Sequence, residues 1–191
     1  MLGAMESLGS LIPAPALEHP GLLAPPVTEA LKSLAGASAV GVAAIDSSLS
    51  DTAAFCKHYG IGMAQAANCI VLKAKTGGYA ALVVLGSTRA DVNGVARREV
   101  GAKVSFAPME EAVRETGMEY GAITPIGLPA SWPILIDKVV ADAPRLVIGS
   151  GLRSSKLILP DALLASLPNA RVVDDLAIKE VRPPLFTKAQ A

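Results

Sequence analysis

The most constrained segment of this chain reads GMEYGAITPIGLPASWPILID, from Gly117 to Asp137. It is dense in glycine and proline, it holds the only tryptophan, and it runs into an apolar stretch that ends on a carboxylate. Glycine permits unusual backbone angles and close approach of a ligand, whereas proline restricts the path of the chain. Because sites commonly lie on loops held by a rigid scaffold, we expect a fixed loop that belongs to a binding site.

Length and composition predict one domain with short terminal extensions. The 191 residues divide into an irregular lead-in over residues 1–26, a single domain over 27–176 and a polar tail over 177–191. Apolar residues make up 51% of the chain but aromatic residues only 4%, so we expect a core of aliphatic side chains and alanine. Basic and acidic residues are equal in number, and this zero net charge argues against a polybasic protein.

Cysteine usage and hydropathy favour a soluble cytoplasmic protein without a membrane partner. Cys56 and Cys69 are the only cysteines, which does not suggest a secreted disulfide framework. Residues 1–13 lack the positive and apolar regions of a signal peptide. The longest apolar runs are far too short to cross a bilayer.

Strands and helices alternate irregularly along the sequence. A Gly-Gly pair at Gly77 separates two apolar runs and predicts a β-hairpin. The pattern favours a mixed α/β (α+β) fold, with a mixed sheet or barrel among helices, over a regular doubly wound sheet. We expect helices over residues 27–34, 51–59, 91–99, 108–116 and 160–167, and strands over 39–45, 69–75, 79–85, 104–106, 133–136, 145–148, 156–159 and 171–173.

No general catalytic signature stands out. His19 and His58 have no ligand-spaced partners, so we expect no metal site and no cofactor. Cys69 opens an apolar strand, where cysteine mostly packs as a small hydrophobe. The Gly149-Ser150-Gly151 turn follows a strand and has two interpretations: a tight turn, or a backbone lip whose N–H groups face an anion or a carbonyl oxygen.

Basic residues are scattered over the chain, and solvated surface is the ordinary interpretation for each of them. Arg97 and Arg98 lie on an expected helix and would contact phosphates if that face lies near a nucleic-acid end. We see no aromatic stacking platform of the kind that single-strand binders use.

From Cys69 to Asp174 the order of features resembles the YbaK family, the editing domains associated with prolyl-tRNA synthetase. The resemblance covers more than half of the chain. Its features are, in chain order, Gln65–Asn68, Cys69–Leu72, Ala81–Leu85, Arg89–Asn93, Val100–Val104, Ala107–Glu111, Thr116–Gly117, Gly121–Gly127, Ile136–Asp137, Ile148–Arg153 and Val172–Asp174.

This resemblance implies a closed or nearly closed mixed barrel surrounded by helices. It also implies hydrolysis, in trans, of the ester of tRNA mischarged with a small amino acid, with the aminoacylated acceptor end as partner. Such a second sieve is useful because one methylene is worth only about 1–3 kcal/mol in binding. A homodimer is left open.

The resemblance places the pocket wall at Gly121–Gly127, with Thr124, Pro125, Ile126 and Gly127 shaping it. Backbone N–H groups near Gly121 and over Gly149, Ser150 and Gly151 would hold the ester carbonyl as it gains negative charge. Thr124 and Ser150 would add hydroxyls, and Arg97 and Arg153 would bind the substrate. Asp137 has two interpretations: a carboxylate that orients the substrate amino group or a water, or a cap or turn residue.

One position departs from the family pattern. Many members carry a lysine just before the first apolar strand, where it anchors the phosphate of the terminal nucleotide, and this chain has Asn68 there. Asparagine can donate a hydrogen bond but brings no charge, and charge-assisted bonds are about twice as strong. Asn68 therefore motivates an alternative, a non-catalytic module that binds tRNA ends or a small ligand. A hydrolase for another small acyl ester is a third hypothesis.

Overall fold

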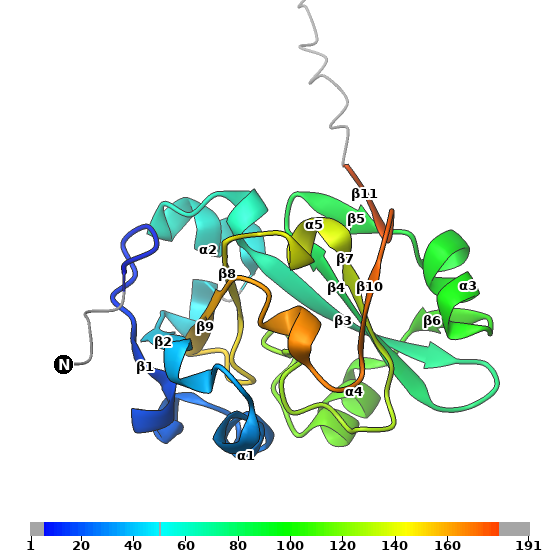
Figure 1. Cartoon of the computed structure of the whole chain (residues 1–191), viewed down its shortest axis with the longest axis horizontal. Coiled ribbons are helices and arrows are strands. Elements are labelled where there is room, and N and C mark those ends of the chain that lie inside the picture. The colour runs from blue at the N-terminus through cyan, green and yellow to red at the C-terminus, as the bar shows by residue number, and fades with distance from the viewer. Residues whose placement is uncertain (1–5, 50, 180–191) are drawn as a thin grey trace, which may run out of the picture.

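The hairpin predicted around Gly77 forms the centre of the structure. The computed structural model describes residues 6–49 and 51–179 (Figure 1). Strands β3 (Ala67–Ala74) and β4 (Tyr79–Leu85) pair antiparallel in a register that places Cys69 opposite Val83. The amide of Gly77 donates to the carbonyl oxygen of Ala74, which closes the turn. The predicted hairpin is therefore confirmed.

A five-stranded mixed sheet is built on this hairpin, in the order β10-β7-β4-β3-β6. The segment that follows the Gly/Pro loop becomes β7 (Ile134–Asp137), which pairs parallel with both β4 and β10 (Ala170–Val173). At the other edge β6 (Val104–Phe106) pairs antiparallel with β3.

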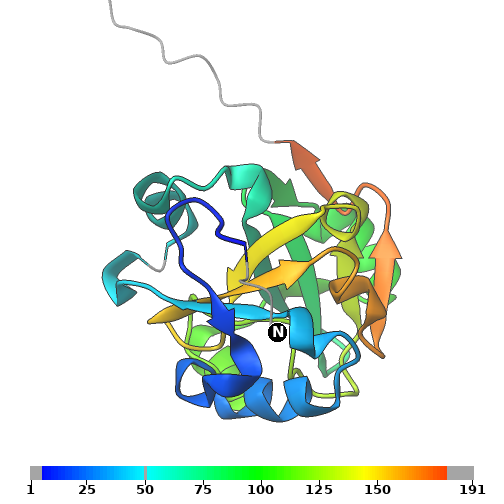
Figure 2. The same cartoon turned by 60° about the vertical axis from the view of Figure 1, so that its left-hand side comes forward.

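A second, antiparallel sheet has the order β1-β2-β9-β8. A separate pair joins β5 and β11 antiparallel. Figure 2 shows β1 and β2 beside each other on the outside of the molecule. The bounds of these strands are β1 Ala14–Pro15, β2 Gly41–Ala44, β8 Arg145–Gly149, β9 Ser155–Pro160, β5 Thr88–Ala90 and β11 Ala177–Lys179.

Short helices surround the two sheets. Figure 1 shows α1 and α2 on the side of the β1-β2-β9-β8 sheet and α3 at the opposite end, beside β6. The α-helices are α1 Pro25–Ser33, α2 Thr52–Tyr59, α3 Arg97–Val100, α4 Met109–Thr116 and α5 Lys138–Ala141. A π-helix spans Val92–Ala96, and 3-10 turns span Ala16–Glu18, Pro20–Leu22, Ala37–Ala39, Ser47–Leu49, Met63–Gln65 and Leu164–Ser166.

Three apolar clusters hold these layers together. Side chains alternate between the faces of a strand, so Val83 packs in the main cluster between the two sheets while Leu82 packs on the outer face of its sheet. In the second sheet Val42 faces the main cluster. Ala43 faces the opposite way, into a separate cluster that contains Phe55 of α2. Both sheets are thus covered on both faces, which explains the continuous apolar runs in β4 and β9.

The predicted closed or nearly closed barrel is wrong, because both sheets are open. They approach each other at β3 and β8, where the described residues form only an isolated parallel bridge between Ala66 and Val147. A barrel needs continuous pairing around its circumference. Strand β6 pairs with the same edge of β3 from Leu72 onward, so β8 can reach that edge only at its start. Residues 67–71 of β3 are left beside an opening.

The helix predicted over residues 160–167 is also wrong. Pro160 ends β9, and the backbone at Ala162 has a φ of 56°, which a right-handed helix cannot contain. Only the 3-10 turn Leu164–Ser166 forms there. The other predicted helices are present within a few residues, and Asp51 and Asp91 accept backbone hydrogen bonds at the starts of theirs.

The terminal segments contribute to the sheets and the core. Within the expected lead-in, Leu11, Ala16 and Ala24 are buried, and β1 pairs with β2. Within the expected tail, β11 pairs with β5, and residues 180–191 lie outside the described part of the chain. The division into lead-in, domain and tail stays a prediction.

Candidate functional site

A cleft of about 520 Å³ lies where the two sheets fail to join. Its volume is in the range of small-molecule sites. The open stretch of β3 lines it, together with the end of β8 and the start of β9. The lining residues are Asp51, Thr52, Ala67, Asn68, Cys69, Ile70, Val71, Phe106, Ala107, Ala112, Tyr120, Gly121, Ile123, Gly149, Arg153 and Lys156.

Asn68 lies in this cleft with a fixed carboxamide. The hydroxyl of Thr52, in the first turn of α2, donates to Oδ1 of Asn68 at 2.7 Å. Because the oxygen is used in this way, the amide N–H groups remain for a ligand. Lys73 does not supply a charge here, since its Nζ pairs with Glu111 of α4 at 2.7 Å.

Two cations line the same cleft as Asn68. Lys156 of β9 pairs in register with Gly149 of β8 and is only 7% exposed. Its Nζ lies 5.3 Å from the centroid of the Phe55 ring. Burial lowers the pKa of Lys156, and nearby Arg153 acts in the same direction, while Cys56 and Asp51 oppose it. Burial of an ammonium group is costly, so its place in the cleft wall is a functional signal.

Arg153 lines the mouth of the same cleft. Its backbone amide donates to the carboxylate of Glu119 at 2.6 Å, and its guanidinium donates to the carbonyl oxygen of Ser47 at 3.4 Å. These two contacts tie the Gly149–Gly151 turn to the Gly117–Asp137 loop and to the segment before α2.

The Gly/Pro loop packs directly on the Gly149–Gly151 turn. The amide of Gly151 donates to the carbonyl oxygen of Ala122 at 2.8 Å. The backbone amide of Glu119 donates to the carbonyl oxygen of Gly151, also at 2.8 Å. A Cβ at Gly149 would overlap the carbonyl oxygen of Ala122 and would lie 2.8 Å from that of Ile123. Glycine is thus required at residue 149 for this close approach.

Two residues of the loop are candidates to donate backbone hydrogen bonds to a ligand in the cleft. Gly121 has a φ of 85°, and both Gly121 and Ile123 line the cleft. Within residues 6–49 and 51–179 the N–H groups of these two residues take part in no hydrogen bond. Gly151, by contrast, uses its N–H on Ala122.

Cys69 lines the cleft without the properties of a nucleophile. Loss of hydration raises the pKa of its thiol to about 12, so the sulfur is protonated at neutral pH. Its side chain also packs against the main apolar cluster, as the sequence predicted.

The structure brings together four of the predicted site residues, namely Asn68, Gly121, Gly149 and Arg153. Ser150, the middle residue of the turn, is fully buried, and its hydroxyl lies 2.7 Å from that of Ser155. Thr124 and Ile126 are fully buried, and neither they nor Pro125 and Gly127 line the cleft. Arg97 lies on α3 at a separate notch.

Asp137 also lies outside the cleft. One carboxylate oxygen accepts from the amide of Val139 at 3.0 Å and caps α5, and the other accepts from the amide of Ala177 at 2.7 Å. Both oxygens therefore hold backbone in place, and the side chain is 5% exposed. The geometry favours the cap interpretation.

We expect Asp137→Ala to lower the free energy of unfolding by about 2 kcal/mol, because it removes a helix cap and leaves the amide of Ala177 without its acceptor. Urea unfolding measures this loss. Asp142→Ala is the matched control, since Asp142 forms only an exposed ion pair with Lys138. Equal stability of the two variants would contradict the capping role.

Sequence reasoning missed several residues of the cleft. Lys156 looked like surface because its burial depends on the pairing of β8 with β9. Phe106 and Tyr120 are 64% and 53% exposed at the cleft, and these isolated aromatic residues gave no pattern in the sequence. Thr52 was recognisable only as part of a helix start.

A protein-family profile matches this chain over residues 46–167, and the family is that of the aminoacyl-tRNA editing domain. The matched region contains every residue that lines the cleft, from Asp51 to Lys156. The chain belongs to the aminoacyl-tRNA editing domain family. The YbaK resemblance is thereby confirmed, and an editing role on aminoacyl-tRNA follows from membership of the family.

Solved structures share the fold of this editing domain. A candidate trans-editing enzyme for prolyl tRNA synthetase is 24% identical, with a TM-score of 0.70, over 82% of this chain and 96% of its own. A scaffold protein from computational epitope grafting is 24% identical, with a TM-score of 0.69, over 82% and 97%. The hypothetical protein APE2540 is 20% identical, with a TM-score of 0.65, over 72% and 90%. At these identities the likeness is one of fold.

Comparison with curated protein sequences finds no match to this editing domain. None of the helices in the described residues has the length and hydropathy that a membrane span requires.

Proposed function

We propose that this editing domain is a trans-acting deacylase, which hydrolyses the ester between a small amino acid and the terminal ribose of a mischarged tRNA. The observation that carries the proposal is the composition of the cleft. It combines a buried cation, a fixed amide donor and two backbone N–H groups around an apolar space.

The acceptor end would enter at the exposed rims of the cleft. Phe106 and Tyr120 offer aromatic surfaces on which the terminal base can stack. Lys156 and Arg153 would bind the phosphate of that nucleotide, with Asn68 as a neutral donor in the same cleft. In this arrangement Lys156 replaces, from β9, the charge that residue 68 does not carry.

The aminoacyl group would lie against Ile70, Val71 and Ile123, where apolar side chains and the Gly/Pro loop limit its size. Rejection of larger amino acids follows from this limit, because a wall of fixed backbone cannot move aside. The small wall residue Ala112 of α4 leaves room for a short side chain.

Hydrolysis would use a water molecule positioned in the cleft. The water oxygen forms a bond to the ester carbonyl carbon, the bond from that carbon to the ribose oxygen breaks, and a proton passes from the water to the departing ribose oxygen. Negative charge develops on the carbonyl oxygen, and the N–H groups of Gly121 and Ile123 would donate hydrogen bonds to it. The substrate's vicinal hydroxyl is the group best placed to relay the proton.

A panel of tRNAs mischarged with Ala, Ser or Cys tests this function. We expect hydrolysis of at least one of them well above the buffer rate, with correctly charged tRNAs of larger amino acids left intact. If none is hydrolysed, the deacylase proposal is wrong. Saturable binding of tRNA without turnover would then favour the alternative of a non-catalytic binding module, which Asn68 motivates.

Asn68→Lys separates two explanations for the departure from the family pattern. We expect no more than a twofold gain in the deacylation rate, because Lys156 already supplies the positive charge. In a Lys156→Met background the same change should restore at least a tenth of the wild-type rate. A large gain in the otherwise unchanged protein would mean that the cleft lacks a working cation. Asn68→Ala is the control for loss of the amide alone.

A further inference from the structure

A second hollow of about 520 Å³ lies on α3 and the turn that follows it, lined by Gly94, Arg97, Arg98, Gly101, Ala102 and Lys103. We call this the α3 notch. Three of its six lining residues are cations and none is acidic, although the whole chain has zero net charge. The other three are glycine and alanine, which leave room for a ligand to approach the backbone.

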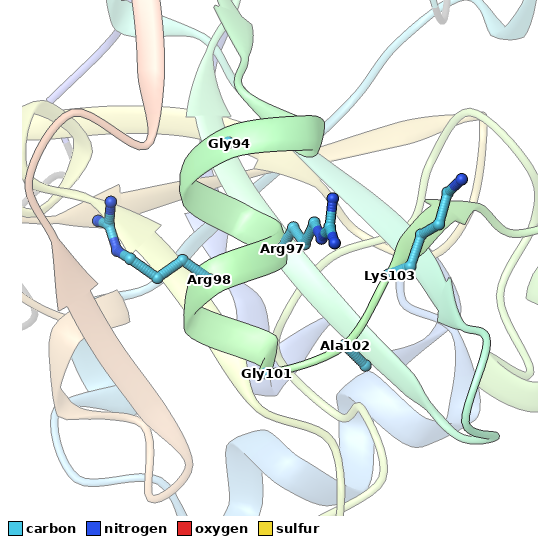
Figure 3. A pocket seen from close by; sticks show the side chains of 6 residues that line it. All are labelled: Gly94, Arg97, Arg98, Gly101, Ala102 and Lys103. Atoms are coloured by element: carbon cyan, nitrogen blue, oxygen red, sulfur yellow. The ribbon is translucent and has the colours of Figure 1, made fainter.

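Two of the cations face the same way. Figure 3 shows the side chain of Arg97 extending from α3 toward the side on which Lys103 lies, whereas Arg98 points away on the opposite side. Among the described residues neither Arg97 nor Lys103 has a carboxylate within ion-pair distance, and both are exposed. Arg98 pairs with Glu99 at 3.3 Å.

The notch and the cleft lie at the two ends of one strand. Lys103 immediately precedes β6, whose last residue, Phe106, lines the cleft. At about 3.3 Å per residue these two positions are about 10 Å apart. That distance corresponds to about three nucleotides at a rise of about 3.4 Å per nucleotide. An RNA strand whose end fills the cleft can therefore place phosphates at the notch.

We propose that the α3 notch binds the sugar-phosphate backbone of the tRNA acceptor stem, a few nucleotides from the aminoacylated end. The inference rests on the proposed function for the identity of the RNA. Arg97 and Lys103 contact phosphates, which positions the stem without reading its sequence. The exposed Phe106 lines the cleft at the end of β6 that is farther from the notch.

The test compares the full-length Arg97→Ala/Lys103→Ala variant with the full-length wild type. The ligand is an acceptor-stem hairpin that carries no amino acid and has a single-stranded 3′ end. Fluorescence anisotropy over a range of salt concentrations measures Kd. We expect the double variant to bind about tenfold more weakly at low salt. The slope of log K against log salt should fall by about 1.5, because two phosphate contacts are lost.

Lys32→Ala/Lys138→Ala is the matched control, since it also removes two exposed cations, from α1 and α5. Its Kd should change less than twofold. Equal Kd values for the two double variants would overturn the proposal. An unchanged salt slope in the notch variant would also overturn it, and is the result expected if the notch binds an acidic protein instead of RNA.

The two proposals fail in different ways. If the wild-type protein binds the hairpin but hydrolyses no mischarged tRNA, the deacylase function fails and the difference in Kd still tests the notch. If hydrolysis occurs, the notch variant should raise KM about tenfold and leave kcat unchanged. An unchanged KM would overturn the notch alone.

Discussion

Lys156→Met is expected to slow deacylation about a hundredfold. The variant keeps an unbranched side chain, one atom shorter, and removes the only strongly buried cation among the described residues of the cleft. Loss of one oriented, desolvated interaction of this kind costs about 2.7–4 kcal/mol in the transition state. Single-turnover hydrolysis of the preferred mischarged tRNA measures the effect.

Two further variants separate charge from packing. Lys156→Arg keeps the positive charge and should retain more activity than Lys156→Met. Lys57→Met removes an exposed cation of α2 and should have the wild-type rate. Urea unfolding gives the folded fraction of each variant, so that the rates are compared per folded molecule. Full activity of Lys156→Met would show that this lysine has no part in the reaction.

The pH dependence supplies an independent readout of the same residue. Burial lowers the pKa of Lys156 below that of an ordinary lysine. If the ammonium form is required, the enzymatic rate above the spontaneous rate falls as pH rises through this lowered pKa. In the window between the folded and unfolded pKa values the unfolded chain binds more protons, so the free energy of unfolding rises with pH. Lys156→Met should abolish this rise.

Gly149→Ala is expected to lower deacylation at least a hundredfold, with a loss of about 3 kcal/mol in the free energy of unfolding. The added methyl group would overlap the carbonyl oxygen of Ala122, which belongs to fixed backbone. Overpacking in a tight site costs about 1–3 kcal/mol or more. The loop must shift to make room, and a displacement of about 1 Å at a reacting group can cost a hundredfold in rate.

Gly21→Ala is the control for this substitution, since a Cβ at Gly21 meets nothing within 4 Å. It should leave stability and rate close to those of the wild type. Activity is compared per folded molecule, with the folded fraction taken from urea unfolding. A Gly149→Ala protein of normal stability and normal rate would mean that the loop does not depend on this close approach.

Local structure was largely predictable from the sequence. Asp51 and Asp91 begin their helices as expected, and Gly60, Gly101 and Gly117 end theirs in left-handed conformations. These signals are local, because a cap or a turn depends on a few neighbouring residues. The helix expected over residues 160–167 does not form, also for a local reason. The backbone at Ala162 has a positive φ, which the sequence pattern did not indicate.

The candidate site was predictable only in part. Asn68 and Gly121, which the resemblance assigned to the site, both line the cleft, whereas the packing of the loop against Gly149 was not predicted. Asp137 and Ser150 looked functional because polar residues after strands often are, yet both bind neighbouring groups inside the fold. Sequence order cannot distinguish a side chain directed into a cleft from one directed behind it.

The sequence by itself determined the strands, the hairpin, the rigid Gly117–Asp137 loop and membership of the editing family, because each depends on residues close together or on a pattern kept in order. Tertiary structure decided what the loop does. The sheets stay open because β6 occupies the edge of β3 that β8 would need. Lys156 and Asn68 line one cleft through pairings between strands far apart in the chain.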